Sequence, residues 1–343
     1  MPPLIITHDT VSVRLESEHL ELVNHAPSGE ANDFVRIRVP IFDIDRVVIV
    51  GRPSVTVPVL QKFMYSGIPV YFQTSHGRWI GGLYPDNNMN AERRIRQYEL
   101  ARDEKLKLAV ASKLVAAKIR NSRRVLQRLA ANRNQSDTPE QERACEMLKR
   151  LGRFSQDRPG TLDQLRGYEG MAAAAYFDRL SSFFPQNIPF VERSRRPPKN
   201  AANALLSWTY AIVQGEIDAA VRSRGLDPCI GFLHAVEHGT PSMTLDLLEP
   251  LRAPLCDLLV LHLLNHAIFR EEHFEFNSED GGTYLKPDSR KEFFFAYENT
   301  MIRKFTIKPG EPHTDFRRVI DNSVLAVVQA IEGRADYEFF DMP

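Results

Sequence analysis

The sequence predicts an α+β protein with two parts: a small amino-terminal antiparallel β domain (residues 1–85) and a larger all-helical domain (residues 86–343). Three observations predict this class. Apolar and polar residues alternate with a period of two up to about residue 85, and apolar residues recur at helical spacing beyond it. A turn-rich segment, Gly81–Asn88, separates the two patterns. With 343 residues, the chain is long enough to bury a core in each part.

Five short runs predict the strands of the amino-terminal domain. Across these runs β-branched residues recur in alternation with polar ones, and Asn, Gly, Pro and Asp stand between the runs. The runs are residues 10–16, 19–23, 34–39, 46–50 and 68–72. One short helix is expected near Val57–Tyr65. The pattern favours a small antiparallel sheet or sandwich.

Residues 91–133 predict a single long helix, because they contain no Pro or Gly and are rich in Ala, Leu, Arg, Lys and Glu. This stretch holds thirteen Lys or Arg and four Asp or Glu, although the whole chain holds 44 of each sign. Its basic side chains suit contact with a phosphate backbone. A solvated helix whose other face supports the fold or a subunit contact explains the charge equally well, and both interpretations stay open.

The remainder predicts helices over residues 138–151, 161–181, 200–223, 244–268, 288–303 and 312–331. The first residues lack the basic, apolar and small-residue segments of a secretory signal. The most apolar stretch, residues 255–269, is shorter than a membrane span and contains Asp and His. We therefore expect a cytoplasmic protein without membrane contact.

Several function classes lack support in the sequence. There is no G-x-x-x-x-G-K-[ST] loop, no G-x-G-x-x-G fingerprint and no G-x-S-x-G motif, so nucleotide hydrolysis, dinucleotide redox chemistry and serine hydrolysis lose their usual signals. A net charge of zero argues by itself against a polyanionic ligand. The basic excess of residues 91–133 nevertheless keeps nucleic acid among the candidate ligands.

The candidate chemistry lies in Gly231–Asp257, where one histidine and several carboxylates stand in an apolar frame. Asp246 and Glu249 are three residues apart, so on a helix both project from one face, and Glu169 adds a third acid upstream. Each residue also has a structural interpretation, because acids complement helix starts and a lone His234 suits a hydrogen-bonded core position. Together they form an oxygen-rich set that favours magnesium or manganese over structural zinc.

With these residues in view, the chain resembles the CRISPR-associated protein one family (Cas one), the integrase that inserts new spacers into CRISPR arrays. Three segments carry the resemblance in order and spacing: Glu169–Phe177, Arg196–Tyr210 and Gly231–Asp257. The family's β domain followed by a helical domain agrees with the pattern described above. The type I-C branch is the most similar. One departure is Asn200, where the family pattern has aspartate after Arg-Pro-Pro-Lys.

The resemblance implies a divalent ion, magnesium or manganese, held by Glu169, His234 and Glu249. Asp246 would then lie beside it, where it orients a metal-bound water or accepts a hydrogen bond from His234. The implied reaction is transesterification, in which a prespacer 3′-hydroxyl attacks a phosphodiester of the CRISPR repeat. Candidate DNA contacts are the basic residues Arg193, Arg195, Arg196, Lys199, Arg252, Lys286, Arg290 and Lys291.

The resemblance also implies partners: double-stranded prespacer and repeat DNA, and a homodimer in which the β domain supplies contacts. Two such dimers would join one dimer of the small protein Cas two, and an end-trimming nuclease would assist. Two alternatives stay open, a structure-specific metal-dependent nuclease that uses water and a non-catalytic DNA-binding scaffold with structural acids. Tyr176 and Tyr210 are expected to fill the core rather than stack on an unpaired base.

Overall fold

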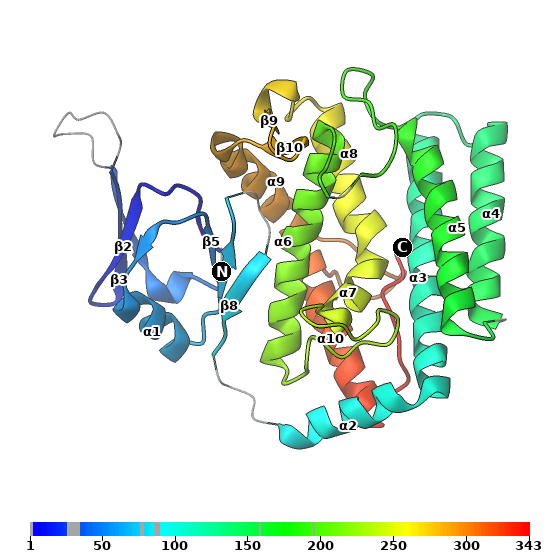
Figure 1. Cartoon of the computed structure of the whole chain (residues 1–343), viewed down its shortest axis with the longest axis horizontal. Coiled ribbons are helices and arrows are strands. Elements are labelled where there is room, and N and C mark those ends of the chain that lie inside the picture. Colours follow the sequence, from blue (N-terminus) through cyan, green and yellow to red (C-terminus); the bar gives the residue numbers. More distant parts are fainter. Residues whose placement is uncertain (1–2, 26–34, 76–78, 86–89, 158, 195) are drawn as a thin grey trace. The chain divides into compact units, whose positions relative to one another are not determined.

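The computed structural model describes residues 3–25, 35–75, 79–85, 90–157, 159–194 and 196–343. The chain divides into two compact units, Met1–Met89 with Leu285–Phe294, and Asn90–Tyr284 with Phe295–Pro343. The first is rich in strands, drawn in blue in Figure 1, and the second is mainly helical. The predicted two-part α+β class is confirmed. The segment Leu285–Phe294, which the sequence assigned to the helical domain, clusters with the first unit.

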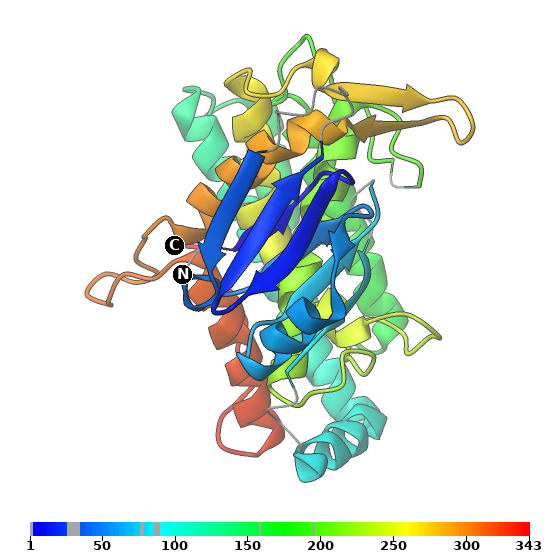
Figure 2. The same cartoon turned by 90° about the vertical axis from the view of Figure 1, so that its left-hand side faces the viewer.

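The described residues of the first unit form two four-stranded sheets, the helix α1 (Val57–Tyr65) and the start of a second helix at Arg290. One sheet has the order β1 (Leu4–Ile6), β5 (Val47–Val50), β7 (Val70–Gln73), β8 (Trp79–Leu83), and the other β4 (Val35–Pro40), β3 (His19–Asn24), β2 (Val11–Glu16), β6 (Ser54–Val55). In Figure 2 these blue strands face the viewer. The antiparallel expectation holds for β2–β3, β3–β4 and β7–β8. It is wrong for β1–β5, β5–β7 and β2–β6, which are parallel. Between β5 and β7 the chain crosses over through α1, which lets both strands run in one direction.

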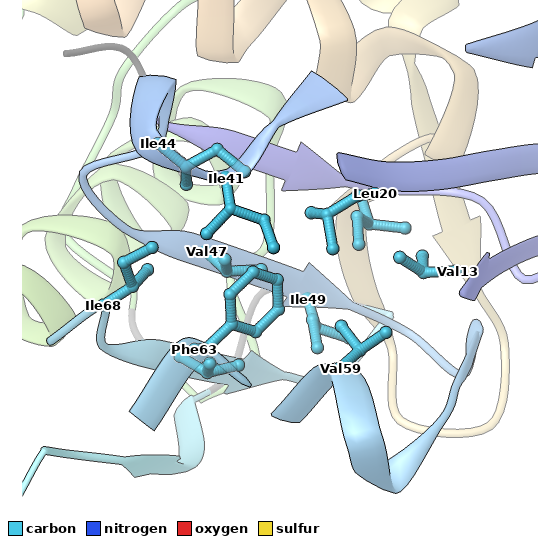
Figure 3. Packing of buried hydrophobic residues seen from close by; sticks show 11 residues of the cluster. Val13, Leu20, Ile41, Ile44, Val47, Ile49, Val59, Phe63 and Ile68 are labelled. Atoms are coloured by element: carbon cyan, nitrogen blue, oxygen red, sulfur yellow. The ribbon is translucent and has the colours of Figure 1, made fainter. Parts of the chain in front are cut away.

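The core of this unit draws on both sheets and on α1. Val13 and Leu20 come from one sheet and Val47 from the other, and all are buried in one cluster with Val59 and Phe63 of α1. Figure 3 shows the α1 side chains turned toward those of β5. All four residues of β5 are buried, as is typical of a central strand with parallel neighbours, whereas only Val13 of β2 is buried.

The second unit consists chiefly of helices, and α3, α4 and α5 pack together along their length (Figure 1). The helices are α2 (Ala91–Arg102), α3 (Glu104–Asn132), α4 (Pro139–Asp157), α5 (Leu162–Ser181), α6 (Ala201–Ser223), α7 (Ser242–Leu248), α8 (Leu258–Asn265) and α10 (Phe316–Ile331), and α9 (Arg290–Ile302) is shared between the units. One face of α3 is buried, including Leu114 and Leu126, so this basic helix supports the fold. In the ranges the structure describes, no helix combines the length and apolarity that a membrane crossing requires.

The predicted single helix over residues 91–133 is wrong at Asp103. The backbone there is extended, and the Asp103 side chain accepts hydrogen bonds from the N–H groups of Lys105 (2.9 Å) and Leu106 (3.1 Å). Asp103 is thus the N-cap of α3. A short acidic side chain that caps α3 ends one helix and starts the next without Pro or Gly. The absence of Pro and Gly from this stretch therefore did not reveal the break.

Two other regions depart from the predicted helices. Instead of one helix over residues 244–268, α7 is followed by a 3-10 turn (Glu249–Leu251), a π-helical turn (Arg252–Asp257) and α8. The prolines at 250 and 254 lack the N–H groups that a continuous α-helix needs. The second unit is also not all-helical, because β9 (Phe274–Asn277) and β10 (Gly282–Leu285) form a hairpin, gold in Figure 2.

Candidate functional site

The four predicted site residues all lie in the second unit and come from four elements. Glu169 belongs to α5, His234 to the loop between α6 and α7, Asp246 to α7, and Glu249 to the 3-10 turn. Helix α3 packs on both α5 and the 3-10 turn, which brings Glu169 and Glu249 to the same place although 80 residues separate them in the sequence.

Asp246 fixes the loop that carries His234. It is 2% exposed, and its Oδ2 accepts hydrogen bonds from the N–H groups of Phe232 (2.6 Å) and Leu233 (3.0 Å). Its Oδ1 lies 3.1 Å from the backbone nitrogen and 2.7 Å from Nδ1 of His234. Because an ionised carboxylate only accepts, Nδ1 carries the proton. Nε2 is left with its lone pair, 3.8 Å from Oε1 of Glu249.

Gly231 allows this loop to approach α7. A Cβ at Gly231 would come within 2.6 Å of Oδ2 of Asp246 and 2.7 Å of the carbonyl carbon of Ser242, both far inside van der Waals contact. Only glycine therefore fits at the first position of the Gly-Phe-Leu-His segment. This close approach lets one carboxylate bind three successive backbone N–H groups.

Lys118 of α3 is a site residue that the sequence argument missed. Its ammonium hydrogen-bonds Oε1 of Glu169, and its Nζ lies 2.6 Å from Oε2 of Glu249. The side chain is only 16% exposed. One signal was present: Lys118 interrupts the apolar run Val115–Ile119, an unusual place for a solvated lysine.

Glu249 is the more deeply buried of the two glutamates, at 5% exposed, and it faces two cations. Besides Lys118, the guanidinium of Arg252 lies 3.0 Å from its Oε1. Burial by itself would raise the pKa of Glu249, but the charges of Arg252 and Lys118 win and lower its pKa to about 2. The carboxylate is therefore ionised throughout the physiological range.

The donor set has the chemistry that a hard divalent cation takes: two carboxylates and one imidazole nitrogen. Oε2 of Glu249 is buried and, among the described residues, accepts no hydrogen bond of good geometry despite its closeness to Lys118. As they stand, the described side chains include no group of three or more His, Cys, Asp or Glu close enough to hold an ion. The ammonium of Lys118 stands between the two glutamates. The ligand roles of Glu169, His234 and Glu249 stay predictions.

Asn121 supports the turn that carries Glu249. This fully buried amide, one helical turn beyond Lys118, donates to the carbonyl oxygens of Pro250 and Phe340, each at 2.8 Å. Its Oδ1 accepts from the N–H of Met342, also at 2.8 Å. Figure 1 shows the carboxy-terminal end beside α3. One side chain thus ties α3, the 3-10 turn and the last residues of the chain together.

A further buried carboxylate, Asp257, interacts with Arg252 of the site. It accepts hydrogen bonds from the hydroxyls of Tyr210 (2.6 Å) and Tyr176 (2.9 Å), so the prediction that both tyrosines belong to the core is confirmed. The guanidinium of Arg252 lies 4.7 Å from the centroid of the Tyr210 ring, which holds Arg252 in place against Glu249. Burial raises the pKa of Asp257 to about 6, although both phenols oppose the rise.

Replacement of Asp257 by asparagine should therefore stabilise the chain more at high pH than at low pH. Because the folded pKa exceeds the ordinary value of 3.8, the stability contributed by Asp257 is fully present below about pH 4 and is lost as the pH rises through about 6. Relative to wild type, the variant should gain about 1.4 kcal/mol in unfolding free energy between pH 5 and pH 8. Urea unfolding at both values measures it, and an equal difference at the two pH values would contradict the raised pKa.

The candidate DNA contacts are placed differently from one another. Arg196 and Lys199 are exposed on the connector before α6, whereas Arg195 lies outside the described residues. The guanidinium of Arg193 donates to two side chains of α6, Oδ1 of Asn203 (2.8 Å) and Oγ of Ser207 (3.2 Å). Arg252 is paired with Glu249. Among the described residues of the connector, Arg196 and Lys199 are therefore the available contacts.

The remaining three candidates belong to the first compact unit. Lys286 and Lys291 are exposed, but Arg290 is 2% exposed, and a guanidinium so buried makes no DNA contact without a local rearrangement. At the departure noted in the sequence, the Asn200 side chain accepts from the N–H of Asn203 (2.8 Å) and caps α6. A neutral amide serves as N-cap as well as aspartate does.

Fold and site together define a two-unit α+β protein with an acid-and-histidine site in its helical unit. The chain belongs to the family of CRISPR associated protein Cas1, whose family model matches residues 4–299. It is 34% identical over 283 residues to CRISPR-associated endonuclease Cas1 1 of Thermodesulfovibrio yellowstonii, covering 82% of this chain and 88% of that one. It is also 34% identical over 274 residues to CRISPR-associated endonuclease Cas1 3 of Thermus thermophilus, covering 80% of this chain and 78% of that one.

Solved structures show the same fold. A casposase bound to an integration product matches with a TM-score of 0.85 at 21% identity, covering 100% of this chain and 94% of that one. A Cas1 protein from Thermotoga maritima matches with a TM-score of 0.79 at 21% identity, covering 99% of this chain and 100% of that one. A chain of a Cas6-RT-Cas1–Cas2 complex matches with a TM-score of 0.79 at 20% identity, covering 99% of this chain and 36% of that one. At these identities the likeness concerns the fold alone. The type I-C assignment stays a prediction.

Proposed function

We propose that this chain is a divalent-metal-dependent DNA integrase and endonuclease of CRISPR adaptation, which joins prespacer 3′-hydroxyl ends to the repeat of a CRISPR array. The observation that carries the proposal is the pair Glu169 and Glu249 around one cation position, with Nε2 of His234 turned toward Glu249. The name endonuclease shared by the relatives supports nuclease chemistry. The casposase of the same fold is bound to an integration product, which supports strand joining.

The chain's own residues would prepare this chemistry. Glu169, His234 and Glu249 would hold magnesium or manganese, which when bound supplies charge neutralisation at the phosphate and a lowered pKa for the attacking hydroxyl. Glu249 is already ionised, since its pKa is about 2, so no proton has to leave before it binds a cation. Asp246 keeps the proton of His234 on Nδ1 and directs the ring. No residue of the protein has to become a covalent nucleophile, because the DNA hydroxyl attacks.

The proposal extends to partners. It includes double-stranded prespacer and repeat DNA, a homodimer of this chain, and two such dimers joined by one Cas2 dimer, with an end-trimming nuclease acting beforehand. A solved complex that contains Cas1 and Cas2 has a chain with this fold, which supports the Cas2 part. The exposed Arg196 and Lys199 would contact phosphates near the site.

Strand joining should depend on a free 3′-hydroxyl. The full chain and its Cas2 partner, with manganese, should join a labelled prespacer duplex to repeat DNA, giving products longer than the labelled strand. A matched prespacer with 3′-dideoxy ends should give none, because the attacking oxygen is missing. Products that are only shortened, and that form equally from both prespacers, would favour the structure-specific nuclease that uses water.

A further inference from the structure

Lys118 occupies the place between the two glutamates that a divalent ion would need. Its ammonium contacts Glu169 and Glu249 at once, and the described contacts of Nζ are with these two carboxylates. The adjoining helix positions Ala117 and Ile119 are buried, so Lys118 has apolar neighbours along the helix and carboxylates at the end of its side chain. A lysine in such a position acts as an internal counter-ion, which prevents two partly desolvated carboxylates from repelling each other.

The charges of the site limit what can be present together. Glu169 and Glu249 contact the cations Lys118 and Arg252, and Asp246 contacts His234. Three carboxylates and two cations leave one uncompensated negative charge. A divalent ion added to this set would make the site positive, so one resident cation has to withdraw. Arg252 is held by the Tyr210 ring, whereas Lys118 has a flexible four-carbon side chain held at its end by the glutamates alone among the described contacts.

We infer that Lys118 is a built-in cation of the metal-free site, which a divalent ion displaces and which a DNA phosphate then takes as its new partner. The inference rests on the proposed function and adds a regulatory step to it. The ion has to compete with the ammonium when DNA is absent. Once a phosphate binds the ammonium, that competition ends, so DNA strengthens metal binding, and the metal strengthens DNA binding by the same factor.

Manganese titration of the full chain without DNA tests the competition, with the free ion measured by electron paramagnetic resonance. Lys118→Met should bind manganese about tenfold more tightly than wild type, which corresponds to about 1.4 kcal/mol. Lys113→Met is the matched control, because Lys113 is an exposed lysine of the same helix, and its affinity should equal that of wild type. Addition of a short DNA duplex should tighten manganese binding by a larger factor in wild type than in Lys118→Met.

The metal-free protein gives a second measurement that does not need activity. Lys118→Met should lower the thermal midpoint, because the glutamates lose their counter-ion, and Glu169→Gln added to it should restore part of the loss by removing the repulsion. A double variant no more stable than the single one would overturn the counter-ion role. If Lys118→Met did not fold alone, the double variant would carry the comparison of manganese affinity against Glu169→Gln.

The outcomes separate this inference from the proposed function. Wild type that binds manganese and joins DNA, together with unchanged or weaker manganese affinity in Lys118→Met, would overturn the displacement and leave the function standing. Failure of wild type and both lysine variants to bind manganese, with no metal-dependent joining, would overturn both. Tighter binding in Lys118→Met alone, with Lys113→Met unchanged, supports the inference.

Discussion

Glu249→Gln should abolish metal-dependent strand joining, with a fall in rate of about a thousandfold or more, and should leave the chain folded. Glutamine has the same shape but no charge, so the site loses the carboxylate that is ionised at every physiological pH. Its amide nitrogen would also face the cations Arg252 and Lys118, which need an acceptor. The joining rate of a labelled prespacer with manganese measures the effect, and circular dichroism checks the fold.

Glu146→Gln is the matched control for this variant. Glu146 is an exposed glutamate of α4 in the same unit, paired with Lys149 at 2.9 Å, and a surface pair of this kind contributes little. Its joining rate should equal that of wild type. Glu169→Gln should resemble Glu249→Gln. If both site variants fold and still join DNA with manganese at the wild-type rate, the acids are structural and the DNA-binding scaffold is the better account.

The fold was predictable where local pattern decides it. Period-two alternation found β2 and β3 within a residue or two, and helical spacing found α5 and α6 almost to the residue. Pairing direction was missed, because Val47–Val50 was grouped with the alternating runs. It is an uninterrupted apolar run, which is typical of a buried strand with parallel neighbours. The break at Asp103 was missed because it depends on hydrogen bonds from the backbone N–H groups of Lys105 and Leu106 to one side chain.

The site was partly predictable for a similar reason. Glu169, His234, Asp246 and Glu249 were singled out, because acids and a histidine in apolar segments require a reason to be there. Which acid holds the histidine depends on backbone approach at Gly231, and that contact exists only in the folded chain. Lys118 was hidden among thirteen basic residues of one stretch.

Helix geometry offered one hint about Lys118 that composition could not. Leu114 and Ser122, four residues before and after it on α3, are both buried, so Lys118 lies on the inward face of the helix. A count of charges over residues 91–133 does not distinguish Lys118 from the other basic residues of the stretch. Counting by face separates it from exposed neighbours such as Lys113, and predicts a buried anionic partner.

Asp246→Ala should be the most destabilising single change in the site, lowering the free energy of unfolding by about 3 kcal/mol or more. Asp246 is 2% exposed, and its removal leaves the buried N–H groups of Phe232 and Leu233 without their acceptor. The loop that carries His234 would loosen, so joining activity should fall as well. Urea unfolding and the joining rate measure the two effects.

Asp246→Asn separates orientation of the histidine from stability of the loop. The amide oxygen can still accept from the N–H groups of Phe232 and Leu233, whereas the NH2 group would take the place of Oδ1, where it cannot accept from the N–H of His234. The NH2 group would donate to Nδ1 of His234, which moves the ring proton to Nε2. We expect most of the stability to return compared with Asp246→Ala, and joining to stay at least about a hundredfold below wild type, because protonated Nε2 offers no lone pair. Histidine nitrogen chemical shifts report the tautomer directly. A variant that keeps the proton on Nδ1 and is still inactive would show that Asp246 serves the reaction through its charge rather than through the ring of His234.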